Sequence, residues 1–226
     1  MSNDSKPRTS KRAKVALTTL AQSAVIAAVY VALTLITSFM AFQSLQLRLA
    51  EALTALPALF PSAIPGVFIG CLLSNALNPS PLGVIDIVFG SLTTLIAALL
   101  TWWIARPWRR ELAGVTAPGP KRSVLRRVLP LLPPVVLNAL VVGTYLPFLL
   151  SPDGSPKAIV IAGSIGSIAL TEAIVVFALG LPLVGAMART PWAKRIYLRE
   201  RERSSKGRRA RAEAERRSDA SSGGSR

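Results

Sequence analysis

The sequence contains no histidine and only one cysteine, Cys71. A disulfide within the chain is therefore impossible, and the usual zinc site of cysteine and histidine ligands lacks its ligands. The missing histidine also excludes acid–base chemistry by an imidazole. Cys71 lies in an apolar run, where we expect a packed, unreactive thiol. We accordingly expect no metal and no cofactor.

The sequence also lacks the short motifs of several enzyme classes. It has no G-x-x-x-x-G-K-[ST] loop, so the chain cannot hydrolyse ATP by that route itself. It has neither an H-E-x-x-H pair nor a G-x-S-x-G turn around a nucleophilic serine. These absences argue against an enzyme and favour a component of a transporter.

Apolar side chains, by contrast, are abundant. Hydrophobic residues make up 51% of the chain, in several runs near the ~20 residues that cross a bilayer. This is typical of a multi-pass protein of the cytoplasmic (inner) membrane. The net charge of +16 is concentrated at the two ends and in residues 105–128, which indicates membrane topology rather than a nucleic-acid surface. RNA binding by the tail is an alternative, but no stacking aromatics accompany its arginines.

The apolar runs predict an all-α membrane protein, a six-helix transmembrane bundle with both termini cytoplasmic. The expected helices are 15–42, 48–59, 65–77, 83–104, 129–150 and 158–188. Around this domain, at 15–188, we expect a basic disordered lead at 1–14 and a basic, largely disordered cytoplasmic tail at 189–226, close to anionic membrane lipid. Six helices keep the hydrophilic loop 105–128, with seven Lys and Arg residues, and the tail, with thirteen, in the cytoplasm. Trp102, Trp103 and Trp108 read as an interfacial aromatic belt.

One stretch, QLRLAEALTALPALFPSAIPGVFIG at residues 46–70, places Arg48 and Glu51 inside an apolar run. Residues three apart share a helix face, so these opposite charges can meet. Ionised side chains at membrane depth usually face a protein interior or a watery cavity. The pair is either the wall of a site or a salt bridge that anchors a helix end. Prolines at 57, 61 and 65 predict a break into two short helices near residues 60–63.

Few other ionisable or amide side chains lie at membrane depth. The candidates for a binding site are Arg48, Glu51, Asp86, Asn138 and Glu172, with Gln43, Gln46 and Asn75 as uncharged companions. Three acids against one arginine suit a neutral or cationic ligand rich in N–H donors. The acids could instead relay protons, and Asp86 and Arg48 could lie at the outer interface.

The first helix carries small residues at every fourth position: Ala24, Ala28 and Ala32. This spacing leaves a shallow stripe where another helix can approach closely. Packing within the chain and contact with a partner subunit both fit the stripe.

Four ordered blocks, QLRLAEALTALPALFPSAIPGVFIGCLLSN, LGVIDIVFGSLTTLIAA, LPPVVLNALVVG and LTEAIVVFALGLPLV, resemble the QueT family of substrate-binding S-components of energy-coupling factor (ECF) transporters. With the first helix the resemblance covers about residues 16–188. It implies a six-helix bundle that captures a queuosine precursor, a deazaguanine base, from outside. It also implies two kinds of partner, a transmembrane coupling subunit and two cytoplasmic ATPases, with the alanines of the first helix on the coupling subunit.

A deazaguanine fits the candidate residues, because one carboxylate can accept its ring N–H and its exocyclic amine together. Three competing functions remain open at this point. An S-component for another vitamin-like ligand would have the same fold. A stand-alone proton-coupled carrier would use Glu51, Asp86 and Glu172, and a structural membrane protein would use its polar residues only to hold helices together.

Overall fold

The structure is a computed structural model that describes residues 6–37, 48–78, 82–115, 120–151 and 154–191, with a few positions beyond. All regular secondary structure in these ranges is helical, as predicted. The elements are α1 (Lys6–Ile36), η1 (Leu49–Ala58), α3 (Ala63–Ala76), η2 (Asp86–Gly90), α4 (Ser91–Ile104), α5 (Arg106–Leu112), α6 (Pro120–Val128), η3 (Leu129–Leu131), α7 (Leu132–Leu137), η4 (Asn138–Val142), α8 (Gly143–Leu150), α9 (Ala158–Val175), η5 (Val176–Gly180) and α10 (Leu181–Met187). Here η1 and η3 are 3₁₀ helices, and η2, η4 and η5 are π-helical turns.

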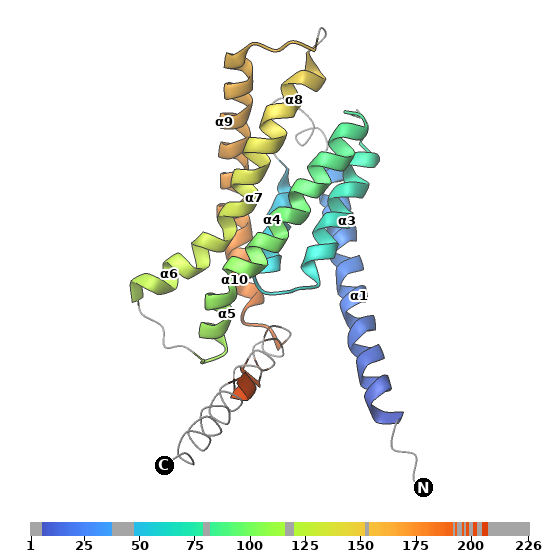
Figure 1. Ribbon diagram of the computed structural model, residues 1–226, viewed down its shortest axis with the longest axis vertical. Helices are drawn as coiled ribbons and strands as arrows, with labels where there is room; N and C mark the ends of the chain where they lie inside the picture. The colour runs from blue at the N-terminus through green and yellow to red at the C-terminus, as the bar shows by residue number, and fades with distance from the viewer. Residues whose placement is uncertain are drawn as a thin grey trace, which may run out of the picture.

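Six apolar helical stretches follow one another in the described residues. Four are long and apolar enough to cross a membrane, namely Ala16–Ile36, Asp86–Ile104, Val124–Leu150 and Ala158–Met187. The other two, η1 and α3, are shorter. The last stretch, Ala158–Met187, is one continuous helix, as predicted for residues 158–188. The start of α1 and the end of α10 lie at the same end of the bundle, where α5 and α6 also lie (Figure 1). Six membrane crossings and cytoplasmic termini remain predictions.

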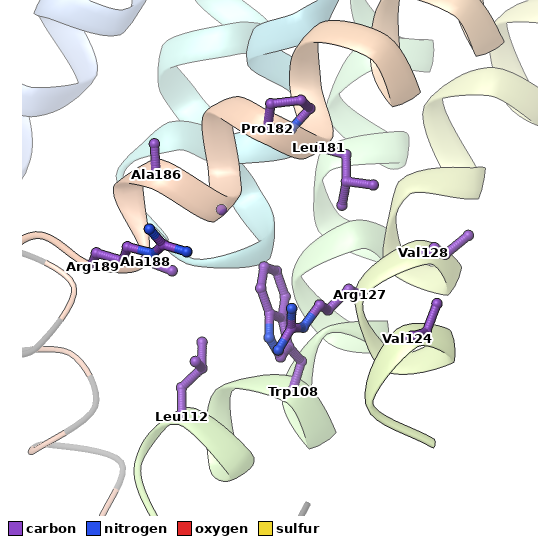
Figure 2. Close-up of a pocket in the computed structure, with 11 residues that line it drawn as sticks. Trp108, Leu112, Val124, Arg127, Val128, Leu181, Pro182, Ala186, Ala188 and Arg189 are labelled. Atoms are coloured by element: carbon purple, nitrogen blue, oxygen red, sulfur yellow. The ribbon is translucent and has the colours of Figure 1, made fainter. Parts of the chain in front are cut away.

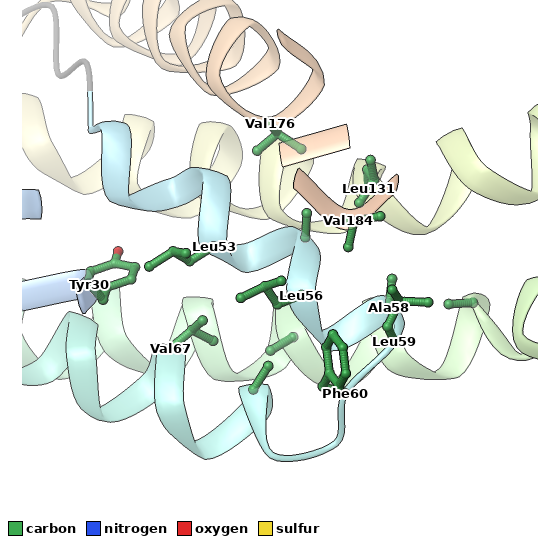
Figure 3. Close-up of a cluster of buried hydrophobic side chains, with 14 of the residues drawn as sticks. Tyr30, Leu53, Leu56, Ala58, Leu59, Phe60, Val67, Leu131, Val176 and Val184 are labelled. Carbon is green, nitrogen blue, oxygen red and sulfur yellow. The ribbon is translucent and has the colours of Figure 1, made fainter. Parts of the chain in front are cut away.

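The 3₁₀ helix η1 lies at the centre of the bundle. Every residue from Ala50 to Ala58 is buried, and Figure 3 shows η1 between Tyr30 and Val67 on one side and Leu131 and Val184 on the other. Ten residues are long for a 3₁₀ helix, which rises about 2.0 Å per residue and has three residues per turn. η1 is therefore about 20 Å long, rather than the 15 Å of an α-helix of the same length.

Three residues per turn divide η1 into three faces. The polar face carries Arg48, Glu51 and Thr54. The second face is small, with alanines at 52, 55 and 58, and the third joins the apolar core through leucines at 53, 56 and 59. The small face admits the backbone of the last helix, because a Cβ on Gly180 would lie 3.0 Å from the Ala52 carbonyl oxygen.

The end of η1 is fixed by proline and by a buried arginine. The chain leaves the helix at residues 59–62, which include Pro61, and α3 begins at Ala63, as the proline spacing predicted. Arg109 Nη1 donates hydrogen bonds to the Ala58 carbonyl at 2.9 Å and to the Trp102 carbonyl at 2.8 Å. Its guanidinium also lies 3.5 Å from the centre of the Trp102 ring.

Three expectations about this end of the bundle need correction. The region 105–128 is no plain hydrophilic loop, because α5 and α6 form within it. Arg109 is only 2% exposed, so it is no solvated loop charge. Trp108 is also buried, at 2% exposure, while Trp103 is 70% exposed, so only part of the expected aromatic belt faces outward.

The two ends of the chain also differ from what was expected or lie outside the described residues. Helix α1 begins at Lys6 rather than near Val15. Most of the expected tail 189–226 lies outside the described residues.

Helices α1 and α3 are closely packed through glycines on α3. A Cβ on Gly66 would lie 2.9 Å from the Ile26 side chain, and one on Gly70 only 2.6 Å from Tyr30 Cβ. Small residues at such contacts let two membrane helices approach closely, which favours van der Waals packing between them. Gly70 therefore sets the position of Tyr30, whose hydroxyl contributes to the site described below.

We expect Gly70→Ala to lower the free energy of unfolding by about 1–3 kcal/mol, because the added methyl group overlaps Tyr30. Thermal unfolding of the detergent-purified protein measures the loss. The matched control is Gly163→Ala in α9, where nothing lies within 4 Å of the added Cβ. Equal unfolding temperatures for the two variants would contradict the packing argument.

Candidate functional site

The polar face of η1 forms one wall of the candidate site. Arg48 is the residue just before η1, and its carbonyl accepts the Glu51 N–H at 3.0 Å; both side chains line the same hollow. Both are buried, with exposures of 9% and 2%. Thr54 continues this face and donates its hydroxyl to the Glu51 carbonyl at 2.6 Å. Buried charges of this kind need partners from neighbouring elements.

Arg48 finds its opposite charge on another helix. Its Nη2 lies 4.0 Å from Oδ2 of Asp86, the first residue of η2. Tyr145 Oη donates a 2.7 Å hydrogen bond to Oδ1 of the same carboxylate, and Asn75 Nδ2 donates to the Asp86 backbone carbonyl at 3.1 Å. Asp86 is 1% exposed and so belongs to the interior of the bundle. These contacts join Arg48 to Asp86, and the meeting of Arg48 with Glu51 stays a prediction.

Two further carboxylates are each held by one donor. Tyr30 Oη donates to Oε1 of Glu51, and Asn138 Nδ2 donates to Oε1 of Glu172 at 2.7 Å. In both glutamates the second oxygen, Oε2, is buried and has no hydrogen-bond partner among the described residues. A buried carboxylate oxygen without a donor is costly, so such oxygens commonly mark places where a ligand binds.

These glutamates line one hollow. It is bounded by Arg48, Glu51, Gly90, Thr94, Asn138, Val142, Ile168 and Glu172. Its volume is about 10 Å³, close to the minimum that holds a single water molecule. The site is therefore nearly closed in this conformation, and any organic ligand requires the surrounding helices to move apart.

The π-helical turns of the bundle fall beside this hollow. Asp86 begins η2, Asn138 begins η4, and η5 begins four residues after Glu172. A π-helical turn inserts an extra residue into an α-helix and is frequent at functional sites. Gly90, the last residue of η2, lets Asn75 pack closely against this helix, because a Cβ on Gly90 would lie 3.0 Å from Asn75 Nδ2.

The structure brings four of the five candidates, Arg48, Glu51, Asn138 and Glu172, to one hollow and places Asp86 behind Arg48. Sequence reasoning missed Tyr30 and Tyr145, which orient two of the acids. A tyrosine inside an apolar helix is a signal that could have been used, since its hydroxyl needs a partner there. Gln43 and Gln46 lie outside the described residues. No group of three metal-ligating side chains occurs in the described ranges.

The alanine stripe lies away from this site. Ala24, Ala28 and Ala32 are exposed, whereas Ala27 and Tyr30 on the other side of α1 are buried. The stripe is therefore not used for packing within the described part of the chain.

We expect Tyr30→Phe to destabilise the fold by about 1–3 kcal/mol, because it leaves a buried oxygen of Glu51 without its donor. A double-mutant cycle measures the free energy of unfolding of Tyr30→Phe, of Glu51→Gln and of the variant with both changes. The stability losses of the two single variants should not add up to the loss of the double variant, since both changes remove the same contact. Full additivity would mean that the two residues do not interact.

Comparison with known proteins identifies the family of this chain. The family model described as QueT transporter matches residues 20–189. Neither a curated protein nor a solved structure matches the chain. The matched residues include all five candidate site residues and the alanine stripe, and the helical stretches of the structure are those of a transmembrane transport component. The chain belongs to the QueT transporter family.

Proposed function

We propose that this protein is the substrate-binding S-component of an ECF-type importer and captures a deazaguanine precursor of queuosine at the hollow. Membership of the QueT transporter family supports the transport role. The observation that carries the site is the pair of buried carboxylates: Glu51 and Glu172 line the same hollow, and each has one oxygen without a partner among the described residues.

The chemistry of the base fits these groups. A deazaguanine presents a ring N–H and an exocyclic amine side by side, and a single carboxylate accepts both. Its carbonyl oxygen needs a donor, which Arg48 provides from the same face of η1. An aminomethyl form of the base adds a cation, for which the second glutamate is the partner. Asp86 keeps Arg48 in place, so we assign it to positioning rather than to direct contact.

The closed hollow adds a conformational step to the proposal. A fused two-ring base occupies many times the volume of one water, so the walls from η1, η2, α4, η4 and α9 must separate on binding. Four of these walls hold a polar contact to another element: η1 through Tyr30, η2 through Tyr145, and η4 and α9 through the contact between Asn138 and Glu172. Ligand binding would exchange some of these internal hydrogen bonds for bonds to the base.

The exposed stripe on α1 is the proposed contact for the coupling subunit. Helices with small residues at every fourth position associate closely in lipid. Ala24, Ala28 and Ala32 face outward, which leaves them accessible to a helix of another subunit. Two cytoplasmic ATPases would drive the assembled importer, since this chain has no phosphate-binding loop. In this proposal all six helices cross the inner membrane and both termini are cytoplasmic.

We expect Glu172→Gln to weaken binding of the deazaguanine by about tenfold to a hundredfold, because a hydrogen bond to a charged group contributes about 1.5–3 kcal/mol. Calorimetry on detergent-purified protein measures the dissociation constant. The matched control, Glu202→Gln, makes the same change at an exposed position of the tail. Unchanged affinity in Glu172→Gln would remove this residue from the site.

We expect Ala28→Trp to abolish co-purification with the coupling subunit and the ATPases while leaving ligand affinity unchanged, because the indole fills the shallow stripe. The control is Val29→Trp, at a 42% exposed position on another side of α1. Normal co-purification of Ala28→Trp would reject the assignment of the stripe. Uptake that does not depend on co-expressed ATPases would instead indicate a stand-alone carrier.

A further inference from the structure

A second cavity lies at the end of the bundle where three apolar stretches terminate. The stretch Asp86–Ile104 ends just before α5, Val124–Leu150 begins within α6, and Ala158–Met187 ends with α10. The space between α5, α6 and α10 has a volume of about 640 Å³. In a membrane, the ends of such helices lie at the level of the lipid headgroups. The cavity therefore lies where headgroup and acyl chain meet.

Most of the wall is apolar. Val124 and Val128 come from α6, Leu181 and Pro182 from α10, and Leu112 from α5. Figure 2 shows the ring of Trp108 standing between these helices, with Val124 and Val128 on one side and Ala186 on the other. Such a wall suits a hydrocarbon chain, and it is open enough on α6 that Val124 is 64% exposed.

The polar side chains that line the cavity in the described residues are all donors. Its only charged lining residues in the described part of the chain are Arg127 and Arg189. Both arginines are exposed, and neither forms an ion pair with a described residue. The adjacent Arg126 differs, because it pairs with Glu111 at 3.1 Å. Two unneutralised guanidinium groups beside an apolar wall attract an anion with a hydrocarbon tail.

Trp108 gives an independent indication of a ligand. The residue is 2% exposed, and its Nε1 is buried without a hydrogen-bond partner among the described residues. A buried indole N–H normally has an acceptor. No carboxylate among the described residues lines this cavity, which is consistent with an acceptor supplied by a bound molecule.

We propose that this cavity binds one anionic phospholipid. Arg127 and Arg189 bind its phosphate, Trp108 Nε1 donates to a phosphate or ester oxygen, and an acyl chain lies along Leu181 and the valines of α6. A basic pocket between membrane helices is suited to an anionic headgroup. The site is separate from the hollow that holds Glu51 and Glu172 and does not depend on the ligand bound there.

Charge and depth favour lipid over an amphipathic helix of a partner protein. A protein helix would bury Arg127 and Arg189 and would have to provide carboxylates for both. A phospholipid supplies the negative charge and the hydrocarbon together, at the depth where the cavity lies.

The test uses the full-length protein purified in detergent, with phosphatidylglycerol and phosphatidylcholine of identical acyl chains. Native mass spectrometry measures retained lipid, and thermal unfolding measures the stabilisation. We expect phosphatidylglycerol to be retained and to raise the unfolding temperature with increasing concentration, and phosphatidylcholine to do neither. The double variant Arg127→Gln/Arg189→Gln should bind phosphatidylglycerol about tenfold more weakly or worse. Trp108→Phe keeps a ring in place and should also reduce retention.

The control Arg201→Gln/Lys206→Gln removes the same charge from exposed positions outside the cavity and should bind like the wild type. Three results would overturn the proposal. They are equal retention of both lipids, wild-type retention by the arginine double variant, and equal loss in the control. If the cavity variants bind lipid normally but no longer co-purify with the coupling subunit, the cavity is a protein contact instead. Deazaguanine affinity, measured in parallel, should not change in any of these variants.

Discussion

The three-residue turn of η1 is the constraint on which the rest of the bundle depends. In this stretch the sequence R-L-A-E-A-L-T-A-L-P-A-L, from Arg48 to Leu59, repeats with a period of three, with exceptions at Leu49, Ala50 and Pro57: one charged or polar face, one face of small residues and one face of leucines. Only a 3₁₀ helix keeps these three kinds of side chain apart. An α-helix would turn 3.6 residues per turn and mix them, placing a charge against the core.

Each face of η1 has its own counterpart in the surrounding helices. The leucine face meets the apolar core around Val67 and Leu131 (Figure 3), and the small face meets Gly180. The polar face meets the Tyr30 hydroxyl of α1 and the Asp86 carboxylate of η2. Because buried charges are tolerated only when paired, the site and the packing of the bundle are parts of one arrangement. The polar residues of the hollow therefore also hold the helices together.

The sequence predicted the parts of this structure that depend on composition. The apolar stretches, the break after Ala58 and the four charged or amide residues of the hollow could be found because charges, amides and prolines are rare in apolar runs. The 3₁₀ conformation was not foreseen, although the three-residue period was visible, because we assumed the α-helical rise. The donors Tyr30 and Tyr145 could not be assigned, since their partners come from other helices and depend on the tertiary arrangement.

The helices α5 and α6 were missed for a related reason. Their many basic residues make the region look like a solvated loop, whereas Arg109 is buried because its guanidinium satisfies two backbone carbonyls. Charge predicts exposure only when no such partner exists. The π-helical turns likewise leave no local sequence signal that we could use.

The period of η1 also restricts how the chain can change in length. With three residues per turn, adding or removing one residue between Arg48 and Pro57 rotates everything before it by about 120°. After a removal Arg48 would point at the last helix, and after an addition it would point at the apolar core; in both cases a leucine would take its place at the hollow. Evolution can lengthen or shorten the connections between helices, but within η1 the only harmless step is a whole turn of three.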